Sequence, residues 1–501
     1  MRRRAACLLL VLATYATAPL ARADKEIEDV RASAFRFGSM AIGQAKDVDY
    51  ARAEGLGLVP ASSLDTYLNG VLTKLLAQSP VKGVPAKVYV RASSDWAAKT
   101  TADANIYVAL GVLLRVDDED EVAAILAHEA SHVVLGHANA DVVQSLQQRA
   151  LQLSDAALDA SGLVARAGGG GAAAVGSNAR MKEQSQALLV NTTLVTPAWN
   201  REQERTADLL GVDLLVRAGY APSAMASVLR KQASFESERA ADPEAHALEQ
   251  QLYAFGVDPK GAVAEQTAKV TGGAGAAAAG ELGALADSAL GAAFKWGSRQ
   301  VTNAQTSHPK TSERITDVEA YVAREYKAES TKAPQDEPWD AAKEQEPTVD
   351  VLSNYISAID AKGKIDKGDV AGAGRLAKAS LSGPTRAHAY PNYVDAAVHI
   401  AQGATAPAAT DYETALAGPE PAGAIYVALS ALYLQTGKND KAVTVIESGY
   451  ARLKEPPGLT LPLIATYRAA GRQADASRVA TTCAARWPTM QKLCLDEANR
   501  Q

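Results

Sequence analysis

The chain has 501 residues, enough for two or three domains, and a formal net charge of −6. An acidic chain without a basic patch argues against nucleic acid as a partner, because phosphate binding requires clustered Lys and Arg. Beyond the first residues, no run of about 18 strongly apolar residues occurs, which argues against an integral-membrane protein.

Residues 1–23 have the organisation of a secretory signal peptide. Three arginines at 2–4 precede an apolar stretch at 5–18, and an Ala-Arg-Ala cleavage motif stands at 21–23. The apolar stretch is too short to span a bilayer, although a retained N-terminal anchor is the alternative. Cleavage removes four arginines and no acidic residue, which brings the charge of the exported chain to about −10.

A first domain is expected over 24–325, mostly helical with a small sheet. Two β-prone runs, 88–90 and 106–108, flank a turn and predict short strands. The following run, 120–127, is interpreted as an amphipathic helix.

The pentapeptide 128–132 continues that helix and reads His-Glu-Ala-Ser-His. Histidines at i and i+4 project from one helix face and can bind one metal ion. Glu129 stands between them, where it can take a proton from the attacking water. Two surface histidines are the alternative, but three of the seven histidines fall within 128–137. The pattern therefore indicates a zinc site.

The middle of the domain is Gly- and Ala-rich. A helix is expected over 142–153. The tract 167–172 predicts a flexible loop near the active-site cleft. The tract 272–291 is compatible with a loosely packed helix that contacts membrane or substrate, which leaves peripheral membrane contact open.

A third ligand is sought downstream, because catalytic zinc takes three ligands from the protein. Glu204 and Asp208 are spaced i, i+4 and share a helix face within 200–211. One can bind the metal while the other orients a histidine. Glu202 is a rival ligand, and a solvated charged face is the alternative.

These segments resemble the gluzincin metallopeptidase family that contains HtpX, the CAAX-prenyl proteases and the BepA-type proteases. That family pairs H-E-x-x-H with a later E-x-x-A-D helix, matched by 204–208. A third element, H-P-x-x-x-x-R-I, is matched by 308–315. The three motifs occur in the family's order.

The resemblance implies a role for each matched residue. The metal ligands are His128, His132 and Glu204, the base is Glu129, and Asp208 supports a ligand histidine. Glu202 is then out of register with the Ala-Asp pair of the family motif. His308 would lie near the zinc, where it could stabilise the oxyanion or restrain access, and the trailing His137 is interpreted as structural.

The segment at 96–104, which precedes the helix with the two histidines, departs from the family pattern. Family members usually carry Asn-Ala and a Pro-Gly-Gly-like stretch, whereas this chain has Trp96-Ala97 and Thr-Ala-Asp-Ala at 101–104. The strand 105–108 follows, and an edge strand at this place in gluzincins binds substrate by β-addition. The altered approach affects subsite preference rather than the metal chemistry.

A charged, Pro-containing linker is expected over 326–348, followed by a repeat domain over 349–501. Tyr433, Gly437 and Ala442 recur one period later as Tyr467, Gly471 and Ala476, and His399, Gly403 and Ala408 stand one period earlier. Gly368 and Ala373 begin the series at a step that is longer by one. A period of about 34 residues predicts an α-solenoid of tetratricopeptide repeats, with a generic helical array as the alternative.

Cys483 and Cys494 are the only cysteines after the leader, and they are either a disulfide of an oxidising compartment or two independent buried thiols. The resemblance implies a periplasmic Gram-negative endopeptidase with one Zn²⁺ per chain, acting on envelope proteins in outer-membrane protein quality control. The repeats would recruit the substrate or a partner such as an outer-membrane assembly complex. The alternative is a chaperone-like or scaffold protein with a regulated or silent protease domain. The intact set of His128, Glu129, His132 and Glu204 favours the protease.

Overall fold

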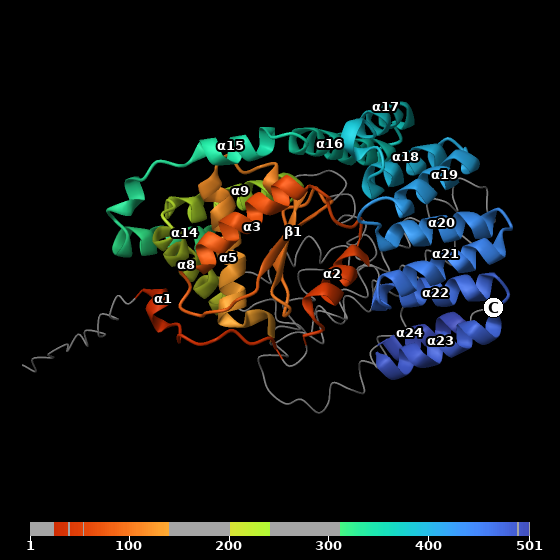
Figure 1. Cartoon of the computed structure of the whole chain (residues 1–501), viewed down its shortest axis with the longest axis horizontal. Coiled ribbons are helices and arrows are strands. Elements are labelled where there is room, and N and C mark those ends of the chain that lie inside the picture. The colour runs from red at the N-terminus through yellow and green to blue at the C-terminus, as the bar shows by residue number, and fades with distance from the viewer. Residues whose placement is uncertain are drawn as a thin grey trace, which may run out of the picture.

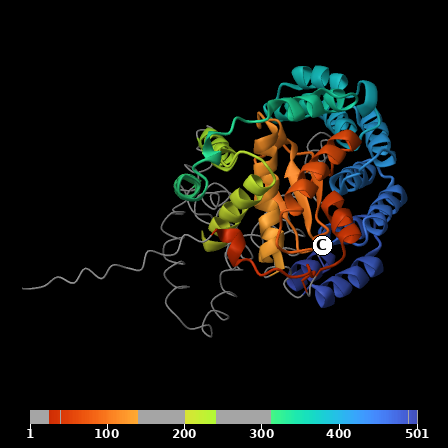
Figure 2. The ribbon, with the colours of Figure 1, turned by 60° about the vertical axis from the view of Figure 1, so that its left-hand side comes forward.

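The computed structural model describes residues 25–38, 41–53, 55–139, 201–240, 311–487 and 490–499. The described chain is mostly helical, as predicted, with one small sheet near its N-terminus (Figure 1). We call the elements from α1 to α15 the N-terminal unit and those from α16 to α24 the helical arc. Figure 2 shows the arc curving around one side of the N-terminal unit. The leader, the helix predicted at 142–153, both Gly/Ala tracts and His308 lie outside the described residues.

The N-terminal unit alternates short strands and longer helices. Its elements are α1 (Glu26–Asp29), α2 (Gln44–Ala53), α3 (Ser62–Leu76), β1 (Lys87–Arg91), β2 (Ala98–Thr100), β3 (Asn105–Ala109), α4 (Leu110–Leu113), α5 (Glu119–Leu135), η1 (His137–Asn139), α8 (Arg201–Arg217), α9 (Ser223–Ala240), α14 (Thr311–Glu325), η2 (Glu329–Thr331) and α15 (Asp336–Glu344).

The sheet contains both predicted strands, but they do not flank a turn directly. β1 and β3 pair in parallel, with Val88 opposite Ile106, and β2 pairs antiparallel with β3. The order β1-β3-β2 makes β3 the central strand and β2 an edge strand of the described sheet. The prediction of 105–108 as the edge strand is therefore wrong. Parallel strands cannot be joined by a tight turn, and the chain places β2 in the crossover between them.

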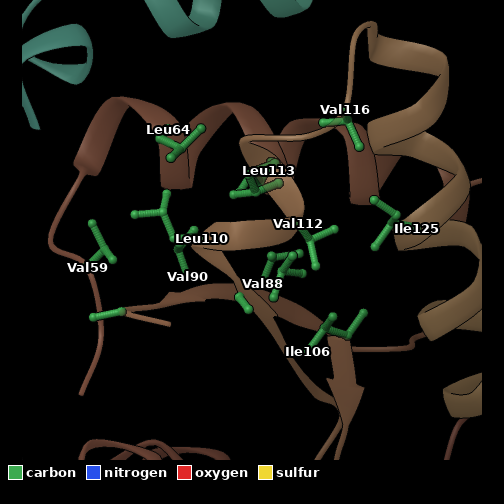
Figure 3. Close-up of a cluster of buried hydrophobic side chains, with 14 of the residues drawn as sticks. Val59, Leu64, Val88, Val90, Ile106, Leu110, Val112, Leu113, Val116 and Ile125 are labelled. Atoms are coloured by element: carbon green, nitrogen blue, oxygen red, sulfur yellow. The ribbon is translucent and has the colours of Figure 1, made fainter. Parts of the chain in front are cut away.

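One face of the sheet packs against α3 and α5. Figure 3 shows Val88, Val90 and Ile106 of the strands meeting Leu64 of α3 and Ile125 of α5. Alternate residues of a strand point to opposite faces, so the intervening residues face the other side. There the rings of Tyr89 and Tyr107 stack at 5.6 Å.

Helix α2 covers this second face. The buried Asp47 carboxylate accepts hydrogen bonds from Asn105 Nδ2 at 2.8 Å, Tyr107 OH at 2.7 Å and Thr101 Oγ1 at 3.1 Å. A buried carboxylate with three donors is compensated for its lost hydration. These bonds fix α2 on the central strand.

Helix α5 was expected to be amphipathic and is instead buried on nearly every side. From Glu119 to Val133 only His128 is more than marginally exposed. α3, β2, α8, α9 and α15 all contact it. Its acidic first turn tolerates burial because α9 and the chain around it supply partners: Glu121 binds Lys231 Nζ at 2.6 Å, and Asp120 accepts from Ala221 N.

The segment predicted as a linker contains helix α15, which packs over α3 and α5 (Figure 1). Trp339 is 1% exposed, stacks on Tyr67 at 5.6 Å and donates from Nε1 to Val116 O at 3.2 Å. Gln335 N donates to Asp120 Oδ2 at 2.7 Å. This mostly charged segment thus contains one large buried apolar side chain, Trp339, which packs it against the rest of the N-terminal unit.

The helical arc consists of consecutive helix pairs. Its elements are α16 (Thr348–Asp366), α17 (Val370–Ser380), η3 (Gly383–Thr385), α18 (Ala389–Ala401), α19 (Thr405–Ala417), α20 (Gly423–Gln435), α21 (Asn439–Arg452), α22 (Pro457–Ala469), α23 (Gln473–Arg486) and α24 (Gln491–Asn499).

The predicted repeat positions have matching geometry in every pair. The glycines that follow α16, α18, α20 and α22 all have positive φ, which a glycine adopts without strain: Gly368, Gly403, Gly437 and Gly471. The alanines at the matching position of each following helix are fully buried: Ala373, Ala408, Ala442 and Ala476. Tyr467 OH donates to Glu447 at 2.6 Å, and Tyr433 makes the same bond to Glu413 one repeat earlier. The helix pairs are consistent with the predicted repeats.

The arc contacts the N-terminal unit through α2. Arg52 Nε and Nη2 donate to the two carboxylate oxygens of Glu420, at 2.5 and 3.1 Å. A Cβ on Gly423 would lie 2.4 Å from the Ala53 carbonyl oxygen, so this position requires glycine. One apolar core runs from α3 through α15 into α16 and α20.

The last two helices of the arc are covalently linked. A disulfide joins Cys483 of α23 to Cys494 of α24. No helix in the described part of the chain combines the length and apolar composition needed to cross a membrane.

Candidate metal centre

The two motif histidines are held on one face of α5. Asp118 caps the helix by accepting from Glu121 N at 2.8 Å, and Gly136 ends it in the left-handed conformation. His128 and His132 lie one turn apart between these ends, on a helix fixed by burial. Their ring orientations are therefore set by a rigid element.

The ring nitrogens of these histidines converge with a glutamate from α8. His128 Nε2 and His132 Nε2 lie 3.1 Å apart. Glu204 Oε2 lies 3.7 Å from His128 Nε2, and its Oε1 lies 3.8 Å from His132 Nε2. One ligand atom from each of the three residues lies within 4.8 Å of the other two. Glu204 and His132 are fully buried, and His128 is partly exposed.

The rival glutamate points elsewhere. The Glu202 side chain is 70% exposed and lies 3.5 Å from Arg205 Nη1, whereas the Glu204 side chain is 3% exposed. Residues at i and i+2 of a helix are about 200° apart, so both cannot face the histidines. The geometry favours Glu204 as the third ligand.

Asp208 lies one turn further along α8, behind the first histidine. Its Oδ1 is 2.9 Å from His128 Nδ1. Burial lowers the pKa of His128, but the hydrogen bond and charge of Asp208 outweigh burial and raise it. A carboxylate at Nδ1 keeps the proton there and leaves Nε2 free to bind a metal.

Arg314 of α14 neutralises the buried carboxylates. Its Nε and Nη2 each lie 2.7 Å from an oxygen of Asp208, and Nη1 lies 3.1 Å from Glu204 Oε2. Burial alone would raise the pKa of Asp208, but the charge and hydrogen bonds of Arg314 lower it to about 2. This paired guanidinium compensates the cost of burying two acids beside a metal site.

Glu129 is held by the edge strand. Thr100 Oγ1 lies 2.7 Å from Glu129 Oε2 and 3.0 Å from its main-chain oxygen. Burial raises the pKa of Glu129, while the His128 charge and the Thr100 hydrogen bond lower it, and the net shift is upward. A carboxyl with a raised pKa is a better proton acceptor at neutral pH.

The trailing histidine contacts the second ligand. His137 Nδ1 lies 2.9 Å from His132 Nδ1. Burial lowers the pKa of His137 to about 4, so its ring is neutral at pH 7 and its Nδ1 can accept a hydrogen bond from the N–H at His132 Nδ1. His137 therefore orients a metal-facing ring from the short helix η1 that follows α5.

This donor set fits zinc. Two imidazole nitrogens and one carboxylate are the ligands of a common catalytic zinc site, which keeps a further position for water or substrate. A carboxylate at His128 Nδ1 and an imidazole at His132 Nδ1 give both histidines the outer partner that metal-binding histidines usually have.

A second group of possible ligands, Asp395, His399 and Asp411, lies in the helical arc. Here Lys378 Nζ lies 3.2 Å from Asp395, and His399 Nδ1 lies 2.6 Å from Asp411. The lysine already supplies the positive charge, and we interpret the group as an ion-pair cluster between helices.

A pocket of about 250 Å³ adjoins the candidate metal centre. Its polar wall includes His128, Glu129 and Glu204, and its apolar wall includes Trp96, Val112, Ile125, Met225, Val228 and Leu229. The Trp96 ring lies 6.4 Å from Phe235 of α9. The tryptophan that departs from the family pattern thus forms part of the pocket wall.

The edge strand β2 borders the same pocket. Ala109 N donates to Ala97 O, and Thr101 N donates to Asn105 O. In an antiparallel pair the main-chain groups alternate in direction, so those of Ala98 and Thr100 face away from β3. Ala98 also lines the pocket. β2 therefore presents main-chain donors and acceptors beside the histidines.

The sequence did not single out three residues that the structure places at the site. Arg314 stands in the matched 308–315 motif, which was a usable signal. Trp96 was noted only as a departure from the family. Thr100 has no signal in the sequence, because its contact with Glu129 depends on how β2 packs against α5. His308 lies outside the described residues.

Comparison with known proteins identifies the family. The family model for peptidase family M48 matches residues 62–322, more than half of the chain. The chain belongs to peptidase family M48. The family prediction is confirmed, and the matched region contains the converging histidines and glutamate.

Two relatives are similar over part of their length. Metalloprotease LoiP of Escherichia coli (strain K12) is 29% identical over 159 residues, which are 32% of this chain and 56% of LoiP. The beta-barrel assembly-enhancing protease of Yersinia pestis is 26% identical over 170 residues, 34% of this chain and 33% of that protein. The chain thus matches about half of one relative and a third of the other.

Proposed function

We propose that this M48 peptidase is an exported zinc endopeptidase that cuts proteins of the bacterial envelope. One observation carries the proposal: two histidine nitrogens and the Glu204 carboxylate meet within 4.8 Å, and Glu129 lines the same pocket. A silent domain has no chemical need for the complete set of ligands, base and supporting partners. This completeness favours the protease over the scaffold alternative.

The residues around the pocket have complementary tasks in peptide hydrolysis. A zinc ion would act as a Lewis acid on the carbonyl and make the attacking water more acidic. Glu129, held by Thr100, would take the proton of that water and pass it to the leaving amine. A substrate strand would pair with Ala98 at the edge of β2 that no other described strand covers. His308 is proposed to stabilise the oxyanion or restrain access.

The compartment and partners rest on other features. The Cys483–Cys494 disulfide supports an oxidising compartment such as the periplasm. One relative is named a beta-barrel assembly-enhancing protease, which supports a role in outer-membrane protein quality control. The helical arc, proposed to be tetratricopeptide repeats, would recruit the substrate or an outer-membrane assembly complex.

Replacing the base tests the proposal. Glu129→Gln should lower peptidase activity at least about 100-fold, because it removes the proton acceptor. It should still bind one zinc per chain, since all three ligands remain. Activity is measured with an unfolded protein such as β-casein, and zinc by elemental analysis. Glu202→Gln, at an exposed position of α8, is the matched control. Wild-type turnover by Glu129→Gln would refute the assignment.

A further inference from the structure

We propose that the cleft between the N-terminal unit and the start of the helical arc holds an extended, unfolded segment of the substrate, on the C-terminal side of the cut bond. This inference rests on the proposed function and extends its site. The cleft has a volume of about 850 Å³. That lies in the upper part of the roughly 300–1,000 Å³ range of ligand sites, which is room for several residues of extended chain.

Both parts of the molecule supply its walls. The N-terminal unit contributes residues 55–57 and 91–95, and the arc contributes residues of α16, α17 and α18, including Gly363, Lys364 and Tyr390. The lining mixes charged, small and apolar groups. Such a lining suits a polypeptide, whose main chain needs hydrogen-bond partners, better than a purely apolar ligand.

A single loop connects the cleft to the metal centre. Ser93, Ser94 and Asp95 line the cleft, and the next three residues, Trp96, Ala97 and Ala98, line the pocket beside His128. The cleft and the pocket are therefore lined by consecutive residues of one chain segment.

This loop is fixed in place. Gly111 N donates to Ser93 O at 2.8 Å, and Ala109 N donates to Ala97 O at 2.8 Å. A Cβ on Gly111 would lie 2.1 Å from Ser94 O, so only glycine permits the close approach. The loop is a preformed wall rather than a segment that must order on binding.

The direction of the substrate follows from the edge strand. A peptide that pairs antiparallel with β2 runs from Thr100 towards Ala98. Its C-terminal part then continues past Trp96 towards Asp95 and the cleft. Residues after the cut bond would therefore contact the cleft, and residues before it would not.

Gly363 offers a way to fill the cleft without disturbing the fold. It lies in α16, lines the cleft, and a Cβ built on it meets nothing within 4 Å. Trp also has a higher helix propensity than Gly. Gly70 is the matched control, because it is exposed in α3, has the same open surroundings and does not line the cleft.

The first test measures binding without cleavage. Fluorescently labelled β-casein is titrated into Glu129→Gln protein carrying Gly363→Trp, Gly70→Trp or no second change, with thermal melting to check the fold. Gly363→Trp should raise the Kd about tenfold, which is a loss of about 1.4 kcal/mol of binding free energy. Gly70→Trp should leave the Kd unchanged. Equal Kd values, or no binding by Glu129→Gln protein, would overturn the inference.

The second test measures direction. Peptides are built around a bond that the wild-type enzyme cuts in β-casein, with a short or a long extension on either side. Extension on the C-terminal side should lower KM, and Gly363→Trp should remove that gain. A gain from N-terminal extension alone would contradict the inference. Failure of the wild-type enzyme to cut any peptide refutes the proposed function instead, while the binding test still decides the cleft.

Discussion

At the scale of single residues, the buried negative charges of the metal centre are compensated by a buried positive one. Glu204 and Asp208 bring two carboxylates into the core, and the Arg314 guanidinium contacts both. Removing one member of such a buried group leaves an uncompensated charge, which is strongly destabilising. Arg314 thus supports the ligand Glu204 directly and the ligand His128 through Asp208.

The identity of the third ligand gives a prediction. Glu204→Ala should reduce zinc affinity strongly, because it removes one of three ligands. Glu202→Ala should leave affinity nearly unchanged, since its side chain is 70% exposed. Asp208→Ala should give an intermediate loss of about 10–100-fold, as expected for an outer partner of a ligand histidine. Competition with a chromogenic chelator measures all three, and equal losses for Glu202 and Glu204 would contradict this choice of ligand.

At the scale of elements, short contacts between neighbouring helices stabilise the arc. The tyrosine–glutamate bond recurs at Tyr433–Glu413 and Tyr467–Glu447, and each joins one helix pair to the next. The last helix has no following pair among the described residues, and the Cys483–Cys494 disulfide joins it to α23 instead. The end of a stacked array needs such a closure, because each repeat is stabilised by its neighbours.

Removal of this disulfide should destabilise the end of the arc. Loop-closure entropy for a sequence separation of 11 predicts that the paired change Cys483→Ser and Cys494→Ser costs about 2–3 kcal/mol. Urea unfolding followed by circular dichroism measures the loss. A reducing agent should lower the stability of the wild-type protein and leave the paired variant unaffected. An equal response of both proteins would show that the disulfide does not act in this way.

At the scale of the whole molecule, α2 joins the sheet to the arc. It binds the sheet through Asp47 and the arc through Arg52 and Ala53. The two parts that α2 joins also form the walls of the cleft. Changes at this interface should therefore affect the cleft as well as stability.

The close approach at Gly423 gives a second stability prediction. Its Cβ would meet the Ala53 carbonyl oxygen at 2.4 Å, and main-chain atoms cannot move aside as a flexible side chain can. Gly423→Ala should therefore cost roughly 1–3 kcal/mol through overpacking. It should also increase hydrogen exchange in α2 and α20. Gly70→Ala, where nothing lies within 4 Å, is the control and should not destabilise.

The interface should also respond to pH. Burial, and then the nearby Glu420, raise the pKa of Asp65 in α3 to about 7 from 3.8. A folded pKa above the unfolded one means that ionisation is disfavoured in the folded state. The free-energy cost of ionising Asp65 in the folded protein is absent below about pH 4, grows as pH rises, and is complete above about pH 7.

Asp65→Asn should consequently stabilise the protein by roughly 1–3 kcal/mol at pH 8 and change little at pH 4. Urea midpoints at the two pH values measure the difference. Glu344→Gln, at an exposed position, should show no such pH dependence. Stabilisation of equal size at both pH values would point to packing rather than charge.

Local rules were enough to predict the chemistry and the repeat period from the sequence. His128 and His132 share a face because a helix repeats every 3.6 residues, and Gly437 and Gly471 end helices because only glycine adopts positive φ without strain. The helix pairs followed from such patterns, whereas the family followed from the resemblance of three motifs. The disulfide stayed one of two alternatives until Cys483 and Cys494 were placed beside each other.

Beyond the ligand set that the resemblance implied, tertiary packing decided which distant residues meet. Thr100 reaches Glu129 across 29 residues, and Arg314 reaches Asp208 across 106. Neither spacing carries a period that a sequence pattern could show. The order β1-β3-β2, the burial of α5 on all sides and the packing of α15 likewise depend on long-range contacts. The cleft beside Asp95 exists for the same reason, since its walls come from residues between 55 and 95 on one side and between 359 and 390 on the other, which lie far apart in the sequence.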